Sequence, residues 1–168
     1  MASIQTAQLK KFLEAGGTIL AIGGSTSLGS YAGLPVANAV AGLPNTRFYV
    51  PGSLVQARLD RNNPIAYGLG ERVDFFFDRS PSFKLDEDAR RNGVRPVAWF
   101  DTDKPLRSGW ALGQAYLKDT TAVLEATVGK GKLVLYGPEI LFRAQPHGTF
   151  KLLFNGIFAG HAQPVELK

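Results

Sequence analysis

The sequence has no cysteine among its 168 residues, and it has only two histidines and one methionine. The lack of cysteine excludes a disulfide framework, a thiolate metal site and a cysteine nucleophile. No apolar run approaches the ~18 residues that a membrane-spanning helix needs. The N-terminal residues also lack the basic and then apolar layout of a signal peptide. We therefore expect no membrane span, and the compartment cannot be read from the residues directly.

A dense cluster of one charge is also missing. The chain carries 19 basic and 14 acidic residues, a net charge of +5, but the basic residues are spread along its length. Charge without a basic run is weak evidence for a nucleic-acid partner, and we expect none. With 45% hydrophobic and 20% charged residues, the composition is typical of a globular protein. We interpret residues 1–168 as one α/β domain of a longer protein.

The N-terminal third predicts a helix, a strand and a tight turn. Thr6 has the side chain of an N-cap, and a stripe at i, i+3, i+4 spacing predicts the helix that follows. That stripe consists of Leu9, Phe12 and Leu13. Glycines at 16 and 17 end the helix. The apolar run 18–22 then predicts a buried parallel strand, and a short helix is expected from Ser27.

The middle of the chain alternates apolar runs with loops rich in Pro, Gly and Asp, which predicts a series of strands. The runs are FYV (48–50), LVQARL (54–59), RVDFFF (72–77), VRPVAWF (94–100) and SGWALG (108–113). The most polar segment, 84–92, predicts a solvated loop or short surface helix. Aromatic residues such as Trp99, Trp110, Tyr67 and 75–77 could form a sugar or peptide platform, but we interpret them as core.

The last third predicts a β-hairpin and an amphipathic helix. Residues 121–128 and 132–136 read as strands joined by a turn with two glycines. Thr149 has the side chain of an N-cap, and Gly160 ends the helix. One predicted face, expected to lie on the sheet, comprises Phe150, Leu153, Phe154, Ile157 and Phe158. Together the elements predict a three-layer, flavodoxin-like α/β sandwich. Because the chain opens with a helix, we expect one or more βα units upstream.

Several segments carry a family resemblance: LKKFLEAGGTILAIGGS (9–25), FYVPGS (48–53), NPIAYG (63–68), SGWALG (108–113) and FRAQ to FKLLFN (142–155). The first resembles the helix and elbow of class I glutamine-amidotransferase-like domains. The set resembles the amidotransferase-like C-terminal domain of bacterial zinc carboxypeptidases of the M14 peptidase family. The likeness covers nearly the whole chain, and the tail is its most specific part.

The resemblance implies an inactive scaffold. Active amidotransferases carry a nucleophilic cysteine at the elbow and a later His-Pro-Glu triplet whose histidine is the base. Here Gly23 or Gly24 occupies the elbow, and Gly137, Pro138 and Glu139 stand in place of the triplet. Glu139 alone cannot activate a nucleophile. We therefore expect no glutamine hydrolysis and no catalytic residue.

The resemblance places zinc in the parent peptidase domain and not in this chain. A site of that family needs a His-x-x-Glu pair and a distant histidine. The two histidines, His147 and His161, are followed three residues later by Phe150 and Pro164. The expected partner is therefore the peptidase domain of the same protein. Most such proteins are exported, which implies a periplasmic or extracellular location and leaves the cytoplasm open.

Two strand-end loops are candidates for ligand binding. The glycine turn, with Gly23, Gly24 and Ser25, could hold an anion with its backbone N–H groups, or it could be a simple turn. A second loop, at the carboxyl end of the sheet, could complete a polar pocket. Its candidate residues are Glu139, Arg143, Gln145 and His147.

We prefer a structural interpretation of the second loop. In that interpretation Arg143 pairs with Glu139, Gln145 binds loop backbone and His147 helps to cap the last helix. A Ser25–His147–Glu139 triad is a further alternative, disfavoured because the elbow places its nucleophile nearer the apex of the turn.

Our first hypothesis is a non-catalytic accessory or interaction domain. The alternatives are a domain that binds an anion, peptide or sugar through these loops, and a cryptic serine hydrolase. An absent first strand would also leave an edge that could pair with a second copy, which predicts a homo-oligomer.

Overall fold

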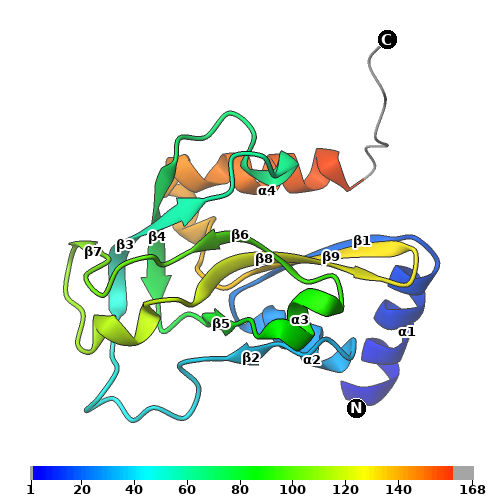
Figure 1. The fold of residues 1–168 in the computed structure, drawn as a ribbon, viewed down its shortest axis with the longest axis horizontal. Helices are drawn as coiled ribbons and strands as arrows, with labels where there is room; N and C mark the ends of the chain where they lie inside the picture. The colour runs from blue at the N-terminus through cyan, green and yellow to red at the C-terminus, as the bar shows by residue number, and fades with distance from the viewer. Residues whose placement is uncertain (1, 161–168) are drawn as a thin grey trace.

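The computed structural model describes residues 2–160, with side chains from residue 5 onward. Within this range nine strands form one mixed sheet between helical layers (Figure 1). Helix α4 (His147–Ala159) covers one face. Helices α1 (Ala2–Glu14), α2 (Leu28–Tyr31) and α3 (Glu87–Arg91) cover the other. The predicted three-layer α/β sandwich is confirmed.

The main strand order is β1-β9-β8-β6-β3-β4. These strands are β1 (Thr18–Ile22), β9 (Gly131–Tyr136), β8 (Thr121–Val128), β6 (Arg95–Trp99), β3 (Pro51–Leu59) and β4 (Arg72–Asp78). Shorter strands are β2 (Ala37–Asn38), β5 (Phe83–Lys84) and β7 (Leu106–Ser108). Strand β1 runs parallel to β9, and the other pairs are antiparallel. Because β1 ends the order, it is a half-buried edge strand, not the fully buried strand that its apolar run predicts.

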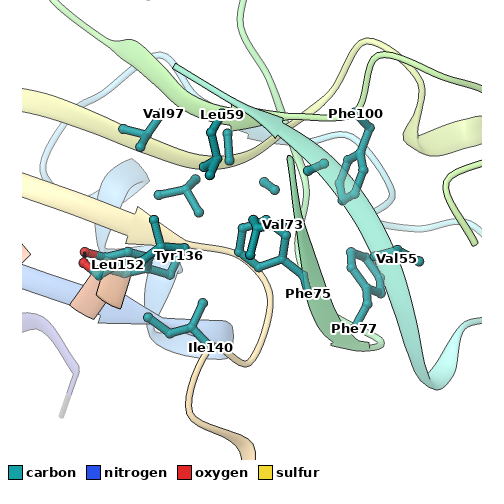
Figure 2. Packing of buried hydrophobic residues seen from close by; sticks show 14 of the residues in the cluster. Val55, Leu59, Val73, Phe75, Phe77, Val97, Phe100, Tyr136, Ile140 and Leu152 are labelled. Carbon is teal, nitrogen blue, oxygen red and sulfur yellow. Dashed lines mark hydrogen bonds between the residues drawn. The ribbon is translucent and has the colours of Figure 1, made fainter. Parts of the chain in front are cut away.

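Two hydrophobic clusters lie on opposite faces of the sheet because successive side chains of a strand alternate. On β9, Val134 and Tyr136 enter the cluster below α4, which Figure 2 shows. Leu133 and Leu135 enter the cluster below α1 to α3. Tyr136 is fully buried, and its hydroxyl donates a hydrogen bond of 3.0 Å to the carbonyl of Leu152 on α4. Burial raises the pKa of this phenol.

The β8–β9 hairpin forms where the sequence predicts it. Gly129 has a φ of +62°, which a glycine adopts without strain. A Cβ on Gly131 would overlap the carbonyl oxygens of Leu13 and Gly17, so this glycine lets α1 approach the hairpin closely. The polar segment 84–92 contains α3, which begins after Asp86; its carboxylate accepts from the N–H of Ala89 at 2.9 Å.

Helix α4 presents a different face to the sheet from the one predicted. Its buried residues are Thr149, Leu152, Gly156 and Ala159, whereas Phe154, Ile157 and Phe158 are exposed. The reason is steric, because a Cβ on Gly156 would overlap the hydroxyl of Tyr136. Small side chains let the helix backbone lie close to the sheet, which leaves the large residues outside.

Both predicted N-caps are wrong. Thr6 lies inside α1, and α4 begins at His147, two residues before Thr149. The hydroxyl of Thr149 is buried and donates to the carbonyl of Ile140 at 2.6 Å, so it anchors the helix to the preceding loop.

The aromatic residues divide between core and surface. Phe75 and Phe77 are fully buried, as predicted, but Tyr67 and Trp110 are 78% and 55% exposed. Trp110 belongs to the run 108–113, which is not a strand: Ser108 ends β7, and the rest is a loop with one isolated bridge between Leu112 and Tyr49. Its backbone N–H and carbonyl both bind the hydroxyl of Ser53.

Candidate functional site

The turn after β1 is the one that the family resemblance predicts to be the nucleophile elbow. Gly23 is buried, has a φ of +58° and begins the short 3₁₀ helix η1 (Gly23–Ser27). A Cβ at this position would overlap the carboxylate of Glu139, which follows β9. The structure therefore brings Gly23 and Glu139 together, and the carboxylate fills the space that a side chain at Gly23 would enter.

The two hydroxyls of this turn bind the backbone of the chain itself. The Oγ of Ser25 accepts from the N–H of Ile22 at 2.8 Å and donates to its carbonyl at 2.7 Å. The hydroxyl of Thr26 donates to the carbonyl of Gly23 at 2.6 Å. Gly24 is exposed, and a Cβ added there would lie in open space among the described residues. Ser25 thus acts as a local cap of the strand end.

Gly137, which the resemblance aligns with the base histidine, is buried between the loop after β4 and strand β8. A Cβ there would overlap the carbonyl oxygen of Pro81 and press on that of Ala122. A histidine could enter this position only if the backbone moved. Among the described residues, a side chain at Gly23 would therefore meet a carboxylate, and one at Gly137 would meet backbone.

The rest of the second loop lies on the surface. Arg143, Gln145 and His147 are exposed. The predicted pair between Arg143 and Glu139 is wrong, since no ion pair or hydrogen bond joins them among the described residues. The guanidinium instead lies 5.0 Å from the centre of the Phe142 ring. Gln145 contributes backbone bonds to this loop, and the side chain of His147 makes a tilted contact with Phe150 instead of capping the helix.

The predicted triad does not form within the described residues. No hydrogen bond joins Ser25, Glu139 and His147 there, and both hydrogen-bonding roles of the Ser25 hydroxyl are taken by Ile22. Residues 2–160 also contain no group of three or more metal-ligating side chains placed to hold an ion. His161 lies outside the described residues. Across residues 2–160, no helix has both the length and the apolar character of a membrane span.

A second surface, which the sequence did not predict, lies beside α4 and η2 (Pro64–Ala66). A shallow hollow of about 400 Å³ is lined by the exposed rings of Tyr67 and Phe158 together with Arg61 and Asn62. The amide of Asn155 fixes its floor by donating to the carbonyls of Ile65 and Tyr67, both at 2.9 Å. We call this surface the aromatic hollow.

A signal for this hollow is present in the sequence. Thr149, Gly156 and Gly160 are spaced by seven and four residues, which places small side chains on one helical face. Such a face can approach a sheet closely, so Phe154 and Phe158 are left on the opposite side. A prediction of the buried face of α4 that considers only its large apolar residues therefore selects the exposed face.

Sequence comparisons identify no relative: no protein-family model matches the chain, and no curated protein is significantly similar to it. Structural comparison finds the fold in the cytoplasmic protein STM3548 of Salmonella typhimurium, with a TM-score of 0.54 and 14% identity. The alignment covers 92% of this chain and 59% of that one. The cytoplasmic protein STM1381 of Salmonella typhimurium LT2 has the same fold, with a TM-score of 0.51 and 14% identity. That alignment covers 93% of this chain and 60% of STM1381.

A ThuA-like protein of Bacteroides uniformis aligns over 92% of this chain and 62% of its own, with 14% identity and a TM-score of 0.49. The present chain thus spans about three fifths of the length of these structures. Similarity at this level of identity concerns architecture alone. It places the chain in a flavodoxin-like α/β architecture and assigns it no activity.

Proposed function

We propose that this chain is a non-catalytic interaction domain of a larger protein. The observation that carries the proposal is the state of the elbow, where Glu139 occupies the space above Gly23 and Ser25 is bound to strand backbone. Nucleophilic catalysis needs a free nucleophile within reach of a base. The elbow offers neither, so its role is to support the strand end.

A binding role is favoured by the aromatic hollow. Phe158 is 76% exposed and stands beside the exposed ring of Tyr67. Large exposed aromatic side chains are typical of binding surfaces, because each ring loses much contact with water at a low entropic cost. We propose that a neighbouring domain docks here. The resemblance in sequence predicts a zinc peptidase domain of an exported bacterial protein, and this prediction rests on the resemblance alone.

The second candidate function is ligand binding at the same hollow. Its volume of about 400 Å³ lies in the range of small-molecule sites. The two rings offer stacking surfaces, while Arg61 and Asn62 offer hydrogen-bond donors. A sugar or the end of a peptide would find both kinds of contact in the hollow. The glycine turn is the poorer candidate, because the hydroxyls of Ser25 and Thr26 already bind backbone groups of the chain.

An activity assay tests the first proposal. The protein and its Ser25→Ala variant are incubated with glutamine, a nitrophenyl ester and a short peptide. We expect both to show the background rate for all three substrates. Turnover by the wild type that disappears in Ser25→Ala would show that the cryptic hydrolase is the correct interpretation.

A thermal-shift screen with sugars and short peptides tests the second. We expect any ligand of the hollow to raise the melting temperature of the wild type and of Trp110→Ala, which removes an exposed ring elsewhere, but not of Tyr67→Ala. A shift that survives Tyr67→Ala would place the ligand away from the hollow. The coding region upstream of Met1 would show separately whether a peptidase domain precedes this one.

A further inference from the structure

Strand β1 pairs with a neighbour on one side only among the residues described. The carbonyl of Gly17 accepts from the N–H of Lys132 on β9 at 3.1 Å, so its backbone groups face β9. Because these groups alternate in direction along a strand, those of Thr18, Leu20 and Ile22 face the open side. The edge is therefore a template for another strand.

One end of this template is already closed. The hydroxyl of Ser25 binds both the N–H and the carbonyl of Ile22, which are the outward groups nearest the turn. The outward groups of Thr18 and Leu20 remain along the middle of the strand. An added strand would pair with this short segment, and the pairing would need support from side chains on both faces of the sheet.

Helix α4 supplies that support on one face. A Cβ on Gly156 would meet Tyr136 of β9 and Leu20 of β1, and one on Gly160 would meet Thr18 of β1. The helix therefore lies above the boundary between β1 and β9. Its flank at Asn155 faces η2, toward the interior of the sheet. At about 3.6 residues per turn, Phe150, Leu153 and Ile157 lie on the flank opposite Asn155, which we infer to be the one beside the open edge; Phe150 and Leu153 are half-buried and Ile157 is exposed.

Helix α1 repeats this arrangement on the other face. Leu13 is fully buried against the sheet, whereas Leu9 and Phe12 are 41% and 53% exposed. The ring of Phe12 lies against Gly17, the residue that precedes β1. Apolar side chains thus flank the start of the open edge both above and below. Exposed apolar patches beside an unpaired edge mark an interaction site.

We propose that two copies of this chain pair antiparallel through β1, about a two-fold axis perpendicular to the sheet. Since α4 lies above the β1–β9 boundary and strands are spaced by ~4.8 Å, this symmetry puts the two α4 axes about 10 Å apart. That separation is within the range of packed helices. The two α4 flanks that would meet carry Phe150, Leu153 and Ile157 and no charge. Each of these side chains can therefore pack near the same residue of the second copy without repulsion between like charges. The pair forms one continuous sheet.

The mass of the particle in solution tests this dimer. Light scattering after size exclusion is expected to give twice 18.1 kDa at micromolar concentrations. Ile157 is 49% exposed and lies on the flank next to the axis, so Ile157→Lys and Ile157→Glu should each give 18.1 kDa. An equimolar mixture of the two should recover the doubled mass, because opposite charges then meet across the axis.

A matched control is Phe158→Lys, which adds the same charge on the outer side of α4 and should keep the doubled mass. Hydrogen exchange of the Leu20 amide should be slower in the wild type than in Ile157→Lys. A monomer at every concentration up to about 100 μM would overturn the proposal. So would a dimer that Ile157→Lys leaves intact, or a mixture of the charge variants that stays monomeric.

Discussion

Gly23 joins two constraints that a side chain cannot satisfy together. Its φ of +58° belongs to the left-handed region, and the space beside its Cα holds the carboxylate of Glu139. The carboxylate is held near the turn because its own backbone N–H donates to the carbonyl of Phe76 at 3.1 Å. Gly24, the next residue, meets neither constraint. The adjacent glycines therefore differ in how much they determine the structure.

Replacement of Gly23 by alanine is expected to lower the free energy of unfolding by about 1–2 kcal/mol, because a residue with a Cβ is strained in the left-handed region, while the carboxylate of Glu139 can turn aside. Urea denaturation measures the change. Gly24→Ala is the matched control and should shift the free energy of unfolding by less than about 0.5 kcal/mol. Equal effects of the two substitutions would show that the backbone of Gly23 is not held in the left-handed region.

Among the elements, α4 shows how small residues decide the orientation of a helix. Gly156 and Gly160 lie against Tyr136 and Thr18, and the hydroxyl of Tyr136 donates to the carbonyl of Leu152. The backbone of α4, and not its large side chains, therefore makes the close contact with the sheet. This orientation exposes Phe158, which lines the aromatic hollow, and Ile157, which lies on the proposed dimer flank.

Alanine at Gly156 should destabilise the protein by about 1–3 kcal/mol, since the added Cβ must push the helix away from Tyr136. This loss should exceed the gain of ~1 kcal/mol that alanine brings to a helix interior. Gly148→Ala, in the first turn of α4 with open space around it, is the control and should be neutral or slightly stabilising. Thermal unfolding compares the two, and a stable Gly156→Ala would contradict the close seating.

The hairpin and the C-terminal ends of α1 and α4 could be predicted from the sequence because local residues determine them, whereas both predicted N-caps were wrong. Gly129 and Gly131 mark the turn, and Gly160 lies directly after α4. The strand order and the buried face of α4 could not be predicted, since they depend on what lies opposite in the fold. Gly23 and Glu139 were both candidates, but their contact joins residues far apart in the chain.

For the whole molecule, acid stability depends partly on one ion pair across the sheet. Arg72 of β4 donates two hydrogen bonds, of 2.9 and 2.6 Å, to the carboxylate of Asp101, which follows β6. The bonds from Arg72 lower the pKa of Asp101 below its usual 3.8. The folded state therefore favours the charged carboxylate. This stabilisation is present at neutral pH and is lost as the pH falls from about 4 through the lowered value.

We expect Asp101→Asn to cost up to about 1 kcal/mol of unfolding free energy at pH 7, the usual upper value for a pair near the surface. The difference from wild type should shrink at pH 3 and below. Urea denaturation at both pH values measures it. Asp103→Asn, at an exposed position two residues along, controls for the loss of one negative charge. A cost for Asp101→Asn that is the same at pH 7 and pH 2 would contradict the role of the charged form.

The parallel pairing of β1 with β9 also sets an order for synthesis on the ribosome. Thr18 pairs with Lys132, so within residues 2–160 strand β1 has no sheet neighbour until β9, more than a hundred residues later, has been translated. At 5–20 residues per second, that interval is on the order of ten seconds. The nascent α1 and β1 must wait in a state without their final contacts, and the late β8–β9 hairpin completes the fold by closing onto them.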